Sequence, residues 1–99
     1  MSLTIAQQVA TKKEFKQNLA ISGLDLATIA QALGTTQATI EANLRLEPDR
    51  LEDPWILRNY LLKQIQAQGQ EPVTFTALKG DYHQYWFLDG GYIDRGIIA

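Results

Sequence analysis

The sequence predicts a mainly α-helical, single-domain protein: a bundle of about five helices followed by a small C-terminal β-hairpin. Two observations lead to this prediction. Apolar residues recur at helical spacing, between clear start and stop signals, through a core of about residues 11–68. An aromatic extension of about residues 72–99 then contains Asp89-Gly90, a favoured hairpin turn, between two apolar runs. A chain of 99 residues has room for one domain with one hydrophobic core.

Two helix-start signals lie close together near the N-terminus. Thr4 with Gln7, and then Thr11 with Glu14, have the spacing of a capping box, in which side chains and backbone amides satisfy one another. The phase of the apolar residues also slips between the two signals. We therefore expect two helices, or one helix bent near Thr11, in the first 22 residues.

Residues 23–46 carry the most specific pattern in the chain, two short helices joined by a tight turn. The first helix has one apolar face and a good N-cap in Asp25. Gly34 follows its last apolar residue, where a left-handed backbone is often needed and glycine has no steric cost. Thr35 or Thr36 can cap the second helix.

This joint resembles the helix-turn-helix of the lambda-repressor-like (Xre-type) regulators. The residues that carry the resemblance are Ile29, Ala30, Leu33, Gly34 and Ile40. The residue after the glycine, Thr35, departs from the pattern, in which an aliphatic side chain is usual. The resemblance implies a helix-turn-helix bundle whose second helix, roughly residues 36–46, enters the major groove of double-stranded DNA.

A longer helix is expected to begin at Asp53-Pro54, with Asp53 as its N-cap and Pro54 as its first residue, and to end near residue 68. Its apolar residues cover more than half of its circumference, so either the C-terminal extension or a second subunit must cover a further side of it. Residues 73–78 alternate as a strand would, although Pro72 could also open a short helix there. We expect the hairpin at residues 84–95.

The aromatic extension carries a second resemblance. In Gly80-Asp81-Tyr82-His83 and in residues 92–96 it is similar to a small bacterial family known only as domain of unknown function family 2316. Together with the helix-turn-helix, this resemblance covers most of the chain. It implies no activity.

The helix-turn-helix resemblance assigns DNA contacts to the outer face of the second helix and to lysines of the helix before it. Gln37 could form two hydrogen bonds with adenine, and Arg45 could reach guanine or a phosphate, whereas Glu41 would repel phosphates. The alternative interpretation is a solvated helix face beside a solvated lysine face. The candidate DNA-binding residues are Lys13, Lys16, Thr36, Gln37, Ala38, Glu41 and Arg45.

Composition argues against several other functions. The chain has no cysteine and only one histidine, His83, so we expect no metal and no cofactor, because a metal site normally takes three or four protein ligands. No arrangement of a nucleophile with a base or of paired carboxylates stands out, so we expect no enzyme. No apolar run approaches the ~20 residues of a membrane span, and no secretory signal is evident, so we expect a cytoplasmic protein.

The sequence thus predicts a DNA-binding transcriptional regulator that acts as a homodimer. The net charge of −2 disagrees with this function, because phosphate contacts by cations supply most non-specific affinity for DNA. The first 22 residues, however, carry three lysines against one glutamate. The alternative function is a protein–protein interaction module that keeps the same fold without binding DNA.

Overall fold

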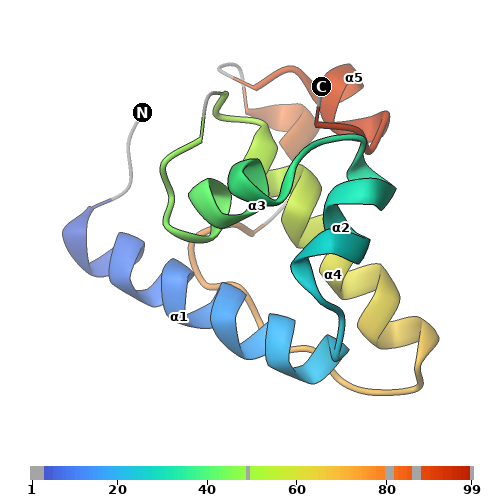
Figure 1. Cartoon of the computed structure of the whole chain (residues 1–99). Coiled ribbons are helices and arrows are strands. Elements are labelled where there is room, and N and C mark those ends of the chain that lie inside the picture. Colours follow the sequence, from blue (N-terminus) through green and yellow to red (C-terminus); the bar gives the residue numbers. More distant parts are fainter. Residues whose placement is uncertain (1–3, 49, 80–81, 86–87, 99) are drawn as a thin grey trace.

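The structure, a computed structural model, describes residues 4–48, 50–79, 82–85 and 88–98. Its helices are α1 (Ile5–Ser22), α2 (Leu26–Leu33), α3 (Gln37–Leu44), α4 (Asp53–Ala67) and α5 (Gly90–Asp94), with a short 3₁₀ turn, η1 (Tyr82–Gln84). Helix α4 runs through the middle of the molecule and packs against α1, α3 and α5 (Figure 1). The predicted mainly helical fold is confirmed.

Helix α1 is one continuous helix, so the prediction of two helices or a bend near Thr11 is wrong. The first capping box is present: Thr4 and Gln7 bond each other's backbone amides. The second is not used as a start, because the Thr11 hydroxyl donates to the carbonyl of Gln7 (2.7 Å) inside the helix. The apolar phase slips because the buried face of α1 contains polar side chains, among them Glu14 and Asn18.

Helix α4 begins near the predicted start, with Pro54 in its first turn. Its N-cap is Glu52, without a side-chain capping bond, so the prediction of Asp53 as the cap is wrong; Asp53 accepts a hydrogen bond from Tyr92 instead. The prediction that this helix is covered on more than one side is confirmed, since α1, α3 and α5 all contact it. The C-terminal extension supplies part of the cover. Its contributions to the hydrophobic core are Phe75, Leu78, Leu88, Tyr92, Ile93 and Ile98.

Residues 73–79, which we call the strap, form neither the strand nor the helix considered from the sequence. The buried side chain of Asn18 bonds both backbone groups of Val73, donating to its carbonyl (3.0 Å) and accepting from its N–H (2.8 Å). Glu14 accepts from the backbone N–H and from the hydroxyl of Thr76. Side chains of α1 therefore satisfy strap backbone groups that a sheet would otherwise pair.

The predicted C-terminal β-hairpin is wrong: the described residues contain no strand, and residues 90–94 form helix α5. Two of the residues assigned to the hairpin, 86 and 87, lie outside the described part of the chain. Asp89 caps α5 by accepting a hydrogen bond from the N–H of Tyr92 (3.1 Å). The two central residues of an Asp-Gly hairpin turn need positive φ, but Asp89 has a φ of −87° and Gly90 is not left-handed either.

The predicted joint between α2 and α3 is confirmed as two helices and a tight turn. Asp25 caps α2 by accepting from the N–H of Thr28 (2.7 Å). The helix ends at Gly34, whose φ of 72° is left-handed. Of the two threonines that follow, Thr36 is the N-cap of α3 and accepts from the N–H of Thr39 (3.2 Å).

The C-terminal tail covers this joint. The N–H of Ile98 donates to the carbonyl of Leu33 (2.8 Å), at the end of α2. A methyl group added at Gly34 would lie only 3.0 Å from the side chain of Ile97. Ala30, on the inner face of α2, is 4% exposed and Ile40 of α3 is fully buried. The joint is therefore packed both against its own helices and against the tail.

Candidate nucleic-acid interface

The outer face of α3 presents a row of exposed side chains. Gln37, Glu41 and Arg45 follow one another at intervals of four residues, so they line one side of the helix, and we call them the α3 ridge. Ile40 and Asn43 occupy the opposite side and are fully buried. Burial on one side and exposure on the other leave the α3 ridge free to contact a large partner.

Two further candidates stand at the N-terminal end of the ridge. Thr36 and Ala38 are both exposed. The Thr36 hydroxyl accepts from the N–H of Thr39 and lies 3.0 Å from the Thr39 hydroxyl, so its lone pairs are partly used within the protein. Ala38 offers a methyl group, which suits apolar contact with the methyl of thymine.

A cleft of about 400 Å³ opens between α1 and the end of α3. The ridge runs into this cleft at Arg45, the residue that ends α3. The residues that line the cleft, which we call the basic cleft, are Lys12, Lys16, Leu19, Leu44, Arg45 and Glu47. Three cations from two helices thus lie around one opening, and two leucines form its apolar part.

Only two of the predicted cations line the basic cleft. The structure brings Lys16 and Arg45 to it, whereas Lys13 is exposed but is not part of its lining. The third cation there is Lys12, which the predicted set of DNA-binding residues omits. Helical spacing does not choose between Lys12 and Lys13, because both lie within about one turn of Lys16. The packing of α1 beside α3 brings Lys12 to the cleft.

Carboxylates moderate the positive charge of this surface. Glu47 lies 3.4 Å from Arg45, and both side chains are more than half exposed, so their ion pair is weak. Glu41 is exposed in the middle of the α3 ridge. At the start of α2, the hydrogen bond from the backbone of Thr28, followed by that from its side chain, holds the pKa of Asp25 below its ordinary value. A negative charge therefore occupies the helix terminus that could otherwise attract a phosphate.

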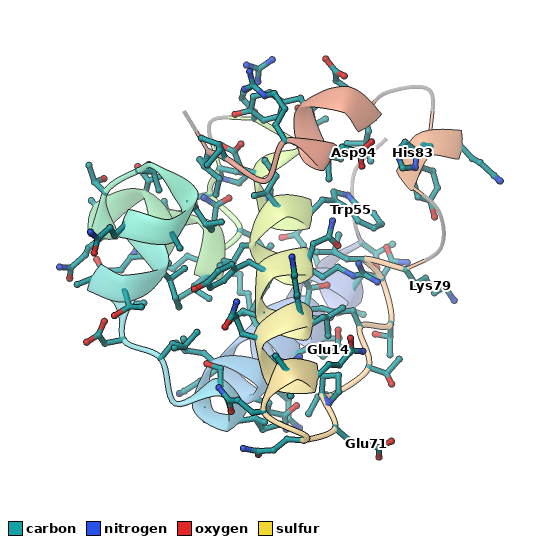
Figure 2. All side chains as sticks on the ribbon, turned by 90° about the vertical axis from the view of Figure 1, so that its right-hand side faces the viewer. Glu14, Trp55, Glu71, Lys79, His83 and Asp94 are labelled. Atoms are coloured by element: carbon teal, nitrogen blue, oxygen red, sulfur yellow. The ribbon has the colours of Figure 1, made fainter. Side chains whose placement is uncertain are left out.

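The only histidine takes part in a contact between η1 and α5. Its Nε2 lies 2.7 Å from Oδ2 of Asp94, and both side chains are half-exposed (Figure 2). The ring of His83 also lies against Gly90, where an added methyl group would come within 2.6 Å of Cδ2. In the part of the chain that the structure describes, no three histidine, aspartate or glutamate side chains gather as metal ligands would. The described helices also include none with the length and apolar character of a membrane span.

A family described as "Uncharacterized protein conserved in bacteria (DUF2316)" matches residues 1–89. This agrees with the similarity seen in the aromatic extension. No match to the chain was found among curated proteins or among solved structures.

Proposed function

This chain belongs to the DUF2316 family of proteins conserved in bacteria, and we propose that it binds double-stranded DNA through the outer face of α3. In this proposal the protein is a transcriptional regulator of the helix-turn-helix kind. The α2–α3 unit contacts the base edges, and the basic cleft lies beside it.

One observation supports the proposal above the others: the exposed α3 ridge leads directly into the basic cleft. A helix that reads bases in the major groove needs cations beside it, because phosphate contacts hold it in register. Arg45 belongs both to the ridge and to the cleft, with Lys12 and Lys16 on the neighbouring helix. This order of groups matches the order of base edges and phosphates across a groove.

Each group then has a defined task. Gln37 forms two hydrogen bonds with adenine, and Arg45 reaches guanine or a phosphate once it leaves its weak ion pair with Glu47. Lys12 and Lys16 hold phosphates, while Lys13 contributes only general attraction. As a homodimer the protein would place two such helices about one turn of DNA, ~34 Å, apart.

The small number of cations limits the affinity. Neutralising two to four phosphates gives a log–log slope of binding against salt of about −2 to −4 per monomer. The proposal therefore predicts modest binding that is strongest at low salt.

The test is fluorescence anisotropy with a labelled duplex from the DNA upstream of the gene and with a scrambled duplex, each at two salt concentrations. Arg45→Ala should weaken binding by about 1–3 kcal/mol for the upstream duplex if Arg45 contacts a base. Lys63→Ala, which removes one exposed cation from α4, is the matched control and should change little. Glu41→Gln should strengthen binding to both duplexes, whereas Glu71→Gln, at an exposed residue before the strap, should not.

Absence of binding by either duplex at low salt, with no rescue by Glu41→Gln, would exclude the regulator. The interaction module on the same fold would then be the better proposal. The exposure of Ile5 and Val9 on α1, at 80% and 62%, already favours a protein-binding surface there.

A further inference from the structure

Helix α1 carries five side chains in one line that the DNA proposal only partly uses. They are Ile5, Val9, Lys12, Lys16 and Leu19, and we call them the α1 stripe. Their spacing of four, three, four and three residues confines them to an arc of about 80° on an α-helix. Residues at alternating intervals of three and four form the contact between two helices that pack side by side, as in a coiled coil.

The N-terminal part of the stripe is an apolar surface open to solvent. Ile5 is 80% exposed and Val9 is 62% exposed. In Figure 1 this end of α1 projects from the rest of the bundle. Apolar side chains one turn apart on a projecting helix form a small exposed apolar patch, which is a feature of protein-binding surfaces.

The C-terminal part of the stripe enters the basic cleft. Lys12 and Lys16 line the opening, and neither forms an ion pair with a described residue. Leu19 and Leu44 supply apolar surface within the same cleft. From Ile5 to Leu19 the stripe is about 21 Å long, which equals four turns of helix.

We infer that the α1 stripe and the basic cleft bind an acidic amphipathic helix from a partner protein. Apolar residues of that helix lie on Ile5 and Val9 and reach the leucines of the cleft, and its carboxylates face Lys12 and Lys16. An amphipathic helix laid along a groove is a common mode of recognition, with anchors at intervals of three and four residues.

Charge argues against a second copy of this chain as the occupant. In a parallel pairing of two α1 stripes, each lysine would face its own equivalent. In an antiparallel pairing over the full length of the stripe, which is centred on Lys12, that lysine would again face itself, and Lys16 would face Val9. Both arrangements set like charges or a charge and an apolar side chain against each other, which opposes association. A helix with carboxylates at the matching positions has no such conflict.

This inference does not depend on DNA binding, although the two surfaces share Lys12, Lys16 and Arg45. A substitution at Val9 distinguishes helix binding from DNA binding, because Val9 belongs to the α1 stripe and not to the α3 ridge or the basic cleft. Val9→Glu should therefore weaken helix binding at least tenfold and change DNA binding much less.

The test uses a labelled, designed helical peptide of 18 residues. On the side that contacts α1 it carries leucines opposite Ile5 and Val9 and glutamates opposite Lys12 and Lys16. Its binding to the full chain is measured by anisotropy. A second peptide keeps the glutamates and replaces the leucines by serine. We expect the first peptide to bind, the second to bind at least tenfold more weakly, and Val9→Glu to weaken the first by a similar factor.

A charge exchange makes the test specific. Lys12→Glu combined with Lys16→Glu should weaken the acidic peptide more than tenfold, and a peptide with lysines in place of its glutamates should then bind this variant. The matched control is Lys13→Glu combined with Lys63→Glu, which has the same change of charge at exposed positions off the stripe. Circular dichroism and thermal melts verify that each variant is folded.

Four outcomes would overturn the inference. The first is no binding of the acidic peptide, and the second is an equal loss of peptide binding in the two double variants. The third is self-association of the protein, seen in light scattering and abolished by Val9→Glu. The fourth is binding of anionic phospholipid vesicles, but not of the peptide, that Val9→Glu abolishes. The second outcome would mean general attraction between charges. The last two would assign the stripe to a second copy and to a membrane, respectively.

Discussion

At the scale of single residues, buried polar side chains of α1 have a clear structural purpose. The amide of Asn18 is fully buried and forms three hydrogen bonds, with the carbonyl of Glu14 and with both backbone groups of Val73. An apolar residue at this position could fill the space but would leave the backbone of the strap unpaired. The polar amide is needed here because the strap has no neighbouring strand that could pair its backbone groups.

Asn18→Ala should therefore destabilise the protein well beyond the lost volume. We expect a loss of about 1–3 kcal/mol from the unpaired backbone groups alone. Chemical denaturation measures it, with Gln17→Ala, an exposed neighbour on the same helix, as the control. Equal stability of the two variants would show that the strap does not depend on Asn18.

The small side chain of Ala30 belongs to the same scale. It is 4% exposed and lies on the inner face of α2, within the hydrophobic core. Ala30→Leu should overpack this site and cost about 1–3 kcal/mol. Ala27→Leu makes the same change at an exposed position of α2 and should leave the thermal melt nearly unchanged. A melt of wild-type shape and midpoint for Ala30→Leu would mean that the site has spare room.

At the scale of elements, one short segment, Asp89-Gly90-Gly91, is locally compatible with two different structures. Aspartate before glycine can form a hairpin turn or cap a helix, and both uses place the aspartate first. In this chain the aspartate side chain bonds the N–H of Tyr92 and its own N–H donates to Glu52 (2.9 Å). The Tyr92 hydroxyl donates to Asp53. These contacts hold α5 against the start of α4, and the helix is the result.

Glycine-to-alanine substitutions test the backbone conformation at the start of α5 and at the end of α2. Gly91 lacks a left-handed φ, and an added methyl group would meet only Oδ1 of Asp89 at 3.4 Å, an ordinary contact. Gly91→Ala should therefore raise the free energy of unfolding by about 0.4–1 kcal/mol. Gly34→Ala, at a φ of 72° and 3.0 Å from Ile97, should lower it. Destabilisation by Gly91→Ala, measured in the same denaturation series, would contradict a helical backbone at this position.

At the scale of the whole molecule, the C-terminal tail and the α2–α3 joint form one packed unit. The bond from Ile98 to Leu33 joins residues far apart in the sequence, and Ile98 is 4% exposed. The last part of the chain therefore packs against the end of α2 and the turn that precedes α3.

Ile98→Ala should destabilise the protein by about 2–5 kcal/mol, the range for removing a buried isoleucine side chain. Faster hydrogen exchange should appear in α2 and at the turn, and not only in the tail. Ile97→Ala, at a half-buried neighbour, is the milder comparison. Exchange that changes in the tail alone would show that the joint is stable without it.

The sequence by itself determined the features that depend on neighbours a few residues apart. The caps at Thr4 and Asp25 and the stop at Gly34 were predictable because each is a bond or a backbone angle within one helical turn. The exposed α3 ridge followed in the same way from the spacing of its residues. These are local rules, and they hold before the rest of the chain is placed.

The tertiary structure decided what depends on distant partners. Asn18 and Val73 are 55 residues apart, so no local pattern showed that a polar face of α1 would be buried or that the strap would remain irregular. Asp89 became a helix cap because Asp53 and Glu52 hold α5 in place. The basic cleft includes Lys12 and omits Lys13 because only the packing of α1 beside α3 selects which lysines meet Arg45. Contacts of long range cost chain entropy, and only the complete core repays it.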